Sequence, residues 1–323
     1  MHKKLLNEAT FYLTISAEGP LLVKSGLEGW DPTLPDMQFM RTRHAQLGET
    51  VFIPGSSIKG TLRSYSEKIA RTLNVECCDP FDRKLSCSGH EKFKPFTEKN
   101  DGRAIYLNSC VACKLYGSMN IASRAAFADA YPTKDISKYL TKRTAVAIDR
   151  VLGSVAVGPF DFEALTSGDF TTQIRLRNFE LWQLGLLGLA LRDLCLGRVR
   201  IGFGKSRGFG SVSARLDKLE LRSIVEEGIS IKDGKLRVKG IGAMLSKEDC
   251  DAYGIAPEEQ ALVEAPTSLG LVDDVIGVGL LFERRTDSSD WCAPEAYGLF
   301  SKCVKASWAK YAESHQSKGA QNG

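Results

Sequence analysis

Residues 53–63 decide the fold, and they read IPGSSIKGTLR. The Pro-Gly pair marks a tight turn that opens directly into a helix. Helix N-termini carry unpaired backbone N–H groups and a partial positive charge, so anions bind there. Lys59 and Arg63 are four residues apart and share one helix face. The segment therefore predicts a seat for a phosphate backbone, although Ser56 and Ser57 are equally typical of ordinary helix capping.

A second basic segment, residues 198–210, reads RVRIGFGKSRGFG and has four cations, four glycines and no acidic residue. Glycine adopts positive φ without strain and lets a backbone approach a ligand closely. Phe203 and Phe209 are suited to stack on bases while Lys205 and Arg207 neutralise phosphates. The spacing fits neither a Walker loop nor a dinucleotide-binding fingerprint. A plain glycine-rich hairpin between strands explains the same residues and stays open as the alternative.

Together the two segments resemble the RAMP superfamily of CRISPR-associated RNA-binding proteins. The similarity includes CVACKLYGS at residues 110–118 and AIDR at residues 147–150, and it runs from near residue 10 to near residue 220. It is closest to the backbone subunits of type III effector complexes. The resemblance implies an α+β fold with a ferredoxin-like (RRM-like) antiparallel sheet core, a cysteine-rich zinc-binding insertion and a projecting β-hairpin thumb.

The order of expected elements indicates the same α+β class. Hydrophobic patterning predicts strands at 10–17 and 123–131, a helix at 57–73 and a hairpin at 145–162. Residues 179–195 are apolar nearly all round, which predicts a buried helix, and a C-terminal helix is expected at 293–312. We expect one RAMP core over residues 1–223, with a long loop at 21–50, the zinc insertion at 75–118 and the thumb at 142–165. Residues 224–323 are expected to form a C-terminal extension that packs on this core or on a neighbouring subunit.

The bulk composition is that of an ordinary globular protein. Of 323 residues, 43% are hydrophobic and 25% are charged, and the net charge is only +4. Evidence for nucleic-acid binding therefore lies in local clusters of cations and not in the total. No apolar run reaches the roughly 20 residues needed to cross a bilayer, and the polar N-terminus is unlike a signal peptide. These absences predict a cytoplasmic protein without a membrane partner, whose nine cysteines do not form a disulfide framework.

The cysteines instead predict a metal site. Five of the nine lie between residues 77 and 113, and Cys110 and Cys113 have the spacing of a two-ligand knuckle. With Cys78 and Cys87 they would make a four-thiolate site, which suits structural Zn²⁺. Cys77 or His90 is a possible replacement for one ligand. The alternative is a set of scattered buried thiols, which is a common fate for cysteine.

The resemblance places a catalytic carboxylate in the loop at residues 30–42. In the similar type III subunits, one aspartate of this loop is required for metal-dependent cleavage of target RNA through attack by a 2′-hydroxyl. Asp36 matches that position best, Asp31 is the alternative, and Mg²⁺ is the implied catalytic ion. Arg41 and His44 are suited to stabilise the charge of the phosphorane. The competing interpretation is that Asp36 is an ordinary turn residue after a proline.

The expected hairpin resembles the thumb with which these subunits flip out a base pair of the guide–target duplex. Arg143 and Arg150 would contact phosphates there, and Val151, Leu152 and Val155 would form an apolar wedge.

The implied function is that of an endoribonuclease acting within a complex. It would bind guide RNA and target RNA beside related RAMP subunits and a large signalling subunit. The rival hypotheses are a non-catalytic scaffold subunit of the same complex, a guide-processing endoribonuclease, and a zinc-stabilised RNA-binding protein unrelated to CRISPR.

Overall fold

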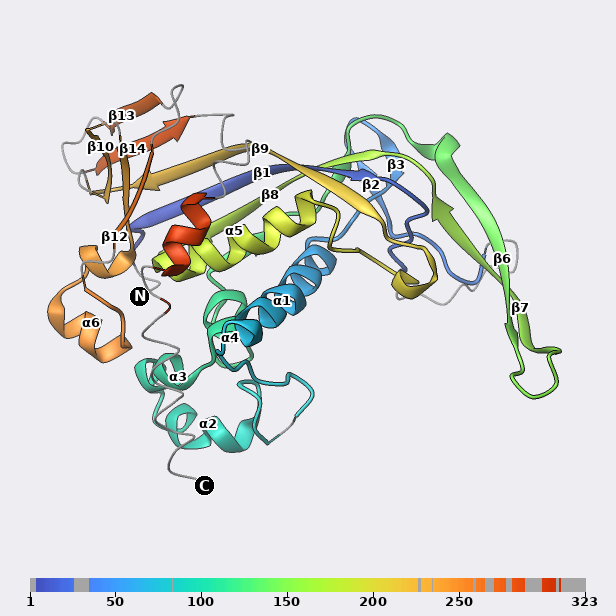
Figure 1. Cartoon of the computed structure of the whole chain (residues 1–323), viewed down its shortest axis with the longest axis horizontal. Helices are drawn as coiled ribbons and strands as arrows, with labels where there is room; N and C mark the ends of the chain where they lie inside the picture. The colour runs from blue at the N-terminus through green and yellow to red at the C-terminus, as the bar shows by residue number, and fades with distance from the viewer. Residues whose placement is uncertain are drawn as a thin grey trace.

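The centre of the protein is an antiparallel β-sheet (Figure 1). The computed structural model describes residues 4–25, 35–82, 84–225, 228–233, 235–257, 260–264, 270–276, 281–287, 298–305 and 308. In spatial order the strands are β13 (Gly270–Ile276), β14 (Leu281–Asp287), β9 (Val212–Ser223), β1 (Asn7–Ala17), β8 (Asp169–Arg177) and β4 (Ala125–Phe127). A short strand, β5 (Tyr131–Pro132), also pairs with β8. The mixture of helices with an antiparallel sheet confirms the predicted α+β class.

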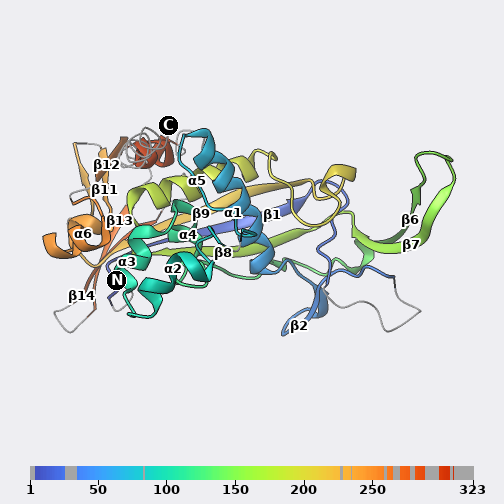
Figure 2. The ribbon, with the colours of Figure 1, turned by 90° about the horizontal axis from the view of Figure 1, so that it is seen from below.

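Two helices cover one face of this sheet, as both ribbon views show (Figures 1 and 2). They are α1 (Gly55–Thr72), which was predicted from its periodicity, and α5 (Leu181–Cys195), which was predicted as a buried helix because it is apolar nearly all round. Helix α5 is buried on nearly all sides because a further helical segment, residues 298–305, packs on it. The contact needs glycine, since a Cβ at Gly188 would collide with the ring of Phe300.

The cysteine-rich insertion lies between α1 and β4 in the sequence and forms a small lobe beside α1 (Figure 1). It contains three short helices, α2 (His90–Thr97), α3 (Gly102–Asn108) and α4 (Val111–Tyr116), where the sequence predicted only irregular structure. Its own core is one small cluster of buried residues, Cys87, Phe93, Ile105 and Cys113. Helices this short carry too few turns to give a periodic apolar pattern.

A long hairpin stands away from the rest of the protein in both ribbon views (Figures 1 and 2). Its strands are β6 (Leu140–Ile148) and β7 (Val155–Leu165), so it extends further at its base than the predicted 145–162.

Two expectations about strands and loops were wrong. The segment 21–50, expected as a loop, contains β2 (Arg41–His44) and most of β3 (Gly48–Val51), which pair as a separate ribbon. Few apolar residues alternate there, so no pattern in this stretch predicts a strand. The single strand expected at 123–131 is divided into β4 and β5, and between them Ala130 pairs instead with Ile53, just before α1.

The C-terminal part adds to the core on two sides. Strand β14 pairs with β9 and so extends the main sheet. A second sheet contains β10 (Ile229–Lys232), β11 (Lys235–Lys239) and β12 (Gln260–Glu264), and α6 (Lys247–Tyr253) follows β11. The helix predicted at 293–312 lies within the described residues only at 298–305 and 308. Across the described part of the chain, none of the helices combines the length and apolarity that a membrane span requires.

Candidate nucleic-acid interface and metal centre

The two basic segments, far apart in sequence, meet at one pocket of about 600 Å³. One stripe of α1 forms its first wall, with Ser57, Thr61, Ser64 and Lys68 at helical spacing. The glycine-rich segment forms the opposite wall. Among the described lining residues every charged side chain is a cation: Lys24, Lys68, Arg198, Arg200 and Lys205. We call this hollow the basic pocket.

The N-terminus of α1 is not itself the anion seat that the sequence predicted. The backbone N–H of Gly55 donates to Asp129 Oδ1 at 2.7 Å, so a carboxylate already lies at the positive end of the helix. The alternative interpretation, that Ser56 or Ser57 caps the helix, is wrong as well. The N-cap residue is Pro54, whose side chain makes no capping hydrogen bond. Ser57 instead lines the basic pocket, while Ser56 is exposed one position away. The side of the helix, not its end, faces the pocket.

The glycines of the second segment let it fold over the protein's own backbone. Gly202 has φ +85°, and a Cβ there would collide with the carbonyl of Leu22. The N–H of the next residue, Phe203, donates to that same carbonyl at 2.8 Å. Arg200 Nη1 donates to the carbonyl of Lys205 at 2.6 Å, which ties the two ends of the turn together. The loop is therefore fixed by internal contacts and presents its cations from a defined backbone.

The two aromatic residues of this loop have different roles. Phe209 is buried, and its ring packs edge-on against Phe162 of β7 with centroids 5.3 Å apart. The guanidinium of Arg143 lies 5.8 Å from the same ring. Phe203 is half-buried, lines the basic pocket and lies beneath Arg207 at 5.1 Å. Only Phe203 is placed to meet a ligand, whereas Phe209 anchors the base of the hairpin.

The cations at α1 and the loop are held in conditions that favour an anionic ligand. Partial burial, followed by the neighbouring charge of Lys68, lowers the pKa of Lys205. Burial and then the charge of Arg63 lower the pKa of Lys59 in the same way. A phosphate beside either ammonium group would offset the repulsion and raise the pKa again. Arg198 is partly neutralised already, since Nη1 lies 3.1 Å from Asp193 Oδ1.

Four cations of the basic pocket were not predicted as binding residues from the sequence. Lys68 falls four residues after Ser64 on the same helix stripe, so extending the periodicity from Ser57 would have found it. Arg198 and Arg200 belong to the quoted basic segment but were not singled out. Lys24 lies outside both motifs, and no local pattern points to it.

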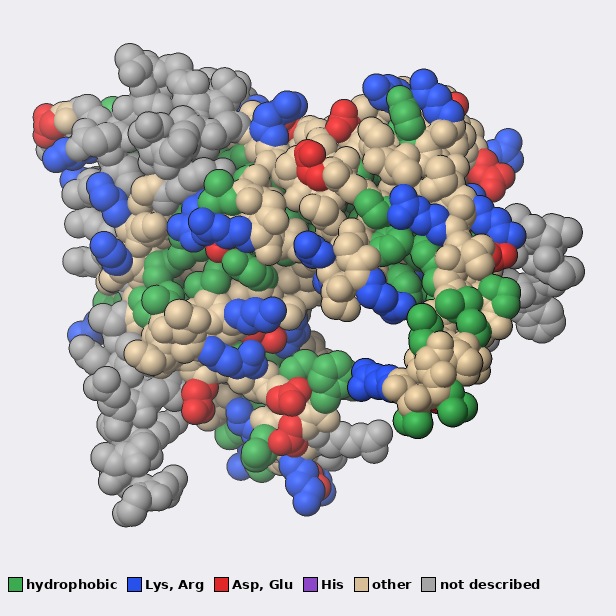
Figure 3. Space-filling view, turned by 45° about the vertical axis from the view of Figure 1, so that its right-hand side comes forward, with side chains coloured by type: hydrophobic (Ala, Val, Ile, Leu, Met, Phe, Trp, Pro, Cys, Tyr) green, Lys and Arg blue, Asp and Glu red, His purple; other side chains and the backbone are tan. Residues whose placement is uncertain are grey.

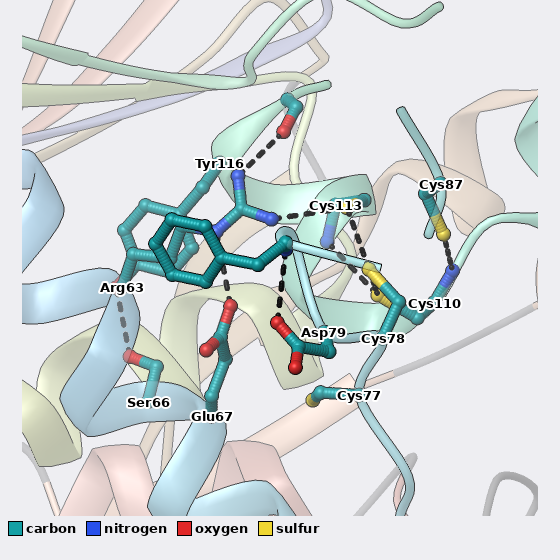
Figure 4. A network of polar contacts seen from close by, with 12 residues as sticks. Arg63, Ser66, Glu67, Cys77, Cys78, Asp79, Cys87, Cys110, Cys113 and Tyr116 are labelled. Atoms are coloured by element: carbon teal, nitrogen blue, oxygen red, sulfur yellow. Dashed lines mark hydrogen bonds and ion pairs between the residues drawn. The ribbon is translucent and has the colours of Figure 1, made fainter. Parts of the chain in front are cut away.

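Arg63 is turned away from the basic pocket and toward the insertion (Figure 4). Its guanidinium makes three contacts: Nε to Glu67 Oε1 at 3.0 Å, Nη1 to the carbonyl of Gly117 at 2.9 Å, and Nη2 to Cys113 Sγ at 3.2 Å. These contacts fasten α4 to α1. The predicted contact of Arg63 with RNA is thus not favoured by its geometry.

Four cysteine thiols converge beside Arg63, and they are the predicted ones: Cys78, Cys87, Cys110 and Cys113 (Figure 4). All four sulfur atoms lie within 4.8 Å of one another. The sulfur of Cys78 lies 3.6 Å from those of both Cys110 and Cys113, which is far longer than a disulfide bond. A tetrahedron with Zn–S bonds near 2.3 Å has edges of about 3.8 Å. The set therefore fits a metal ion such as zinc.

The surroundings favour the thiolate form at Cys110 in particular. Hydrogen bonds, that with Cys113 first, hold the pKa of the Cys110 thiol well below its usual range, whereas the hydrogen bonds with Cys110 raise the pKa of Cys87 and Cys113. The guanidinium of Arg63 supplies a positive charge beside Cys113. Cys77 hydrogen-bonds to Cys110 but is outside the group of four. The side chain of His90, the other possible replacement, lies outside the described residues.

Comparison with known families decides the identity. The model of the RAMP superfamily matches residues 14–213, which is well over half of the chain. The protein belongs to the RAMP superfamily. A search of curated proteins gave no match. Membership supports a CRISPR-associated role in RNA binding, and the matched range includes both walls of the basic pocket and the whole cysteine set.

In this RAMP protein the loop that carries Asp36 is bound to the base of the hairpin. Asp36 is exposed, and its Oδ2 accepts the backbone N–H of Asp161 in β7 at 2.9 Å. Met37 forms a parallel bridge with Phe162. Glu163, also in β7, accepts the N–H of Phe39 at 2.9 Å. Asp31 lies outside the described residues.

The two groups expected to assist Asp36 are engaged elsewhere. Arg41 forms a two-pronged ion pair with Glu163, with both contacts at 2.8 Å. Its charge is therefore neutralised within the protein, which argues against its expected role at a phosphorane. The ring of His44 packs against Tyr131 with centroids 5.1 Å apart, and its Nδ1 accepts the N–H of Gln46.

The tip of the hairpin of this RAMP protein is apolar and open to solvent. Val151 is 91% exposed, Leu152 79% and Val155 57%. Asp149 accepts the N–H groups of Val151 and Leu152 and so orders the turn, with the exposed Arg150 between. Lys and Arg side chains border the open space between the hairpin and the body of the protein (Figure 3).

Proposed function

We propose that this RAMP protein is the guide-RNA-binding backbone subunit of a type III CRISPR effector complex. The observation that carries the proposal is the meeting of α1 and the glycine-rich loop in one pocket whose charged residues are cations. A phosphate backbone matches such a pocket in charge, and the contact would be independent of base sequence. Guide–target pairing would supply the sequence specificity.

The arrangement of the sheet supports the same proposal. Strands β4, β8, β1 and β9 are neighbours, every pair is antiparallel, and α1 and α5 link β1 to β4 and β8 to β9. A ferredoxin-like core requires this order. The insertion follows α1, and the hairpin precedes β8. The hairpin would act as a thumb, with its exposed apolar tip unstacking bases of the guide–target duplex.

We further propose that the subunit cleaves target RNA, with Asp36 as general base. Asp36 would take the proton of a 2′-hydroxyl, the 2′-oxygen would attack the adjacent phosphorus, and the bond to the 5′-oxygen would break. Water would then protonate the leaving oxygen. The carboxylate is exposed at the base of the hairpin, where a target strand lying along the hairpin would reach it. Mg²⁺ would supply positive charge to the phosphorane, held by the carboxylate together with RNA oxygens.

The cleavage proposal predicts a large effect of Asp36→Asn in the assembled complex. The amide still accepts the N–H of Asp161 but is not a base, so the loop should keep its place while the chemistry slows. Loss of a general base costs roughly 100-fold or more in rate. Cleavage of a guide-complementary RNA in Mg²⁺ measures this, and the RNA affinity should stay within about twofold. Asp135→Asn, at an exposed turn, serves as the control.

A second function, a non-catalytic scaffold subunit, is favoured by one observation. Arg41, expected to stabilise the transition state, is already paired with Glu163. If Asp36→Asn and Asp31→Asn both leave the cleavage pattern unchanged, the chain binds guide RNA without cutting target RNA.

A further inference from the structure

Phe81 is an aromatic side chain that the fold leaves 90% exposed. It lies in the insertion, three residues after the metal ligand Cys78. Single exposed apolar residues are common on protein surfaces, so exposure alone implies nothing. The residues around the ring indicate a function for it.

The turn that carries Phe81 is ordered. Asp79 Oδ1 accepts the backbone N–H of Phe81 at 2.9 Å, and the carbonyl of Asp79 accepts the N–H of Asp82 (Figure 4). Asp82 in turn accepts the N–H groups of Lys84 and Leu85. With Cys78 in the metal set, the ring is presented from a backbone that is fixed on both sides.

Between Phe81 and α1 lies a second hollow of about 600 Å³, which we call the Phe81 hollow. It shares Gly60 and Ser64 of α1 with the basic pocket, so the two hollows adjoin at this side of the helix. A Cβ on Gly60 would meet no atom within 4 Å, which leaves the floor between them open. A chain lying in the basic pocket can therefore continue over α1 toward Phe81.

The charges in the lining of the Phe81 hollow balance, with two cations, Arg63 and Arg71, and two carboxylates, Glu67 and Asp79. Arg63 pairs with Glu67 at 3.0 Å, and Asp79 accepts the N–H of Phe81. The hollow is therefore suited to a base and not to a phosphate group. The apolar part of the lining is Phe81 with Pro80, which is one aromatic surface on a polar rim and not a broad apolar face.

We propose that Phe81 is a stacking platform for a base of single-stranded RNA whose backbone lies in the basic pocket. The inference rests on the proposed RNA-binding function and adds a base-binding site to it. A row of cations followed by an exposed ring is the arrangement by which proteins hold single strands without reading sequence. The platform would therefore accept any base.

The test is binding of a single-stranded RNA that contains one 2-aminopurine, moved stepwise along the strand, to the full-length protein. With wild type, stacking should quench the fluorescence at one position of the probe. Phe81→Ala should abolish that quench and weaken the affinity by about 5- to 100-fold, the range for losing one stacked base. Phe81→Trp and Phe81→Tyr should restore both, because each keeps a ring.

Leu85→Ala is the matched control, since Leu85 is 71% exposed in the same insertion, and it should bind RNA as wild type does. Zinc content and thermal melting show that each variant is folded. The inference is overturned if Phe81→Ala binds and quenches as wild type, or if the Trp and Tyr variants lose as much affinity as the Ala variant. It is also overturned if Phe81→Ala impairs only assembly with other protein subunits.

The closing comparison separates this inference from the function on which it rests. If Lys68→Ala with Arg200→Ala weakens RNA binding and Phe81→Ala does not, the basic pocket is supported as the RNA-binding site and the stacking role of Phe81 is refuted. If neither change has an effect, both proposals fail.

Discussion

We expect a Cys113→Ser variant to bind no zinc and to lose the folded structure of the insertion. The core of the insertion is a cluster of four buried residues, two of which are the ligands Cys87 and Cys113. Phe93 and Ile105 remain, and burying one such side chain stabilises a fold by roughly 1.5–3 kcal/mol. Structural zinc contributes about 10–16 kcal/mol in small metal-dependent domains. A zinc ion held by the four thiols would therefore dominate the stability of this lobe.

Elemental analysis should find about one zinc per wild-type chain and almost none in Cys113→Ser. Limited proteolysis should cut the variant within residues 75–118 and spare the wild type. Cys77→Ser is the matched control, because Cys77 neighbours a ligand but lies outside the group of four, and it should keep its zinc. Zinc retained in Cys113→Ser, or lost in Cys77→Ser, would show that the ligand set is wrong.

Replacing Lys68 and Arg200 together by alanine lowers the affinity for single-stranded RNA by about 100-fold. The two cations come from opposite walls of the basic pocket, so one phosphate backbone lying in it would contact both. Each charged hydrogen bond is worth roughly 1.5 kcal/mol or more, which is about tenfold in affinity. Each lost phosphate contact should also reduce the slope of log K against log salt by about 0.7 for a single strand.

A salt titration by fluorescence anisotropy measures both quantities. The control is Arg215→Ala with Lys218→Ala, which removes the same charge from β9, outside the basic pocket. If the two double variants weaken binding equally, the effect comes from net charge, and the basic pocket is not the specific binding site for the RNA backbone.

Local patterns predicted the elements with strong periodicity and the metal ligands. Helices α1 and α5 have long apolar patterns, and the hairpin is bounded by turn residues. The cysteine set followed from one CxxC pair and its neighbours. In each case the signal is contained in a short stretch of chain.

Contacts between residues distant in the sequence determine the features that local patterns did not predict. Asp129 accepts a hydrogen bond from the first residue of α1, which lies 74 positions away in the sequence. Glu163 forms an ion pair with Arg41, which lies 122 positions away. The periodicity of α1 put Lys59 and Arg63 on one face, but only the packing of α4 turns Arg63 toward Cys113. The same packing leaves Lys68 and Ser64 to line the pocket. Side-chain partners are set by tertiary structure, which local patterns do not encode.

The basic pocket as the RNA seat is tested most directly by photocrosslinking. Single-stranded RNA containing 4-thiouridine would be bound to the full-length protein, irradiated and mapped by mass spectrometry of the crosslinked peptides. The predicted crosslinks lie in α1 and in residues 198–210, the two walls that form the pocket. Crosslinks confined to β1, β8 and β9, with none in either wall, would contradict the proposed RNA-binding surface.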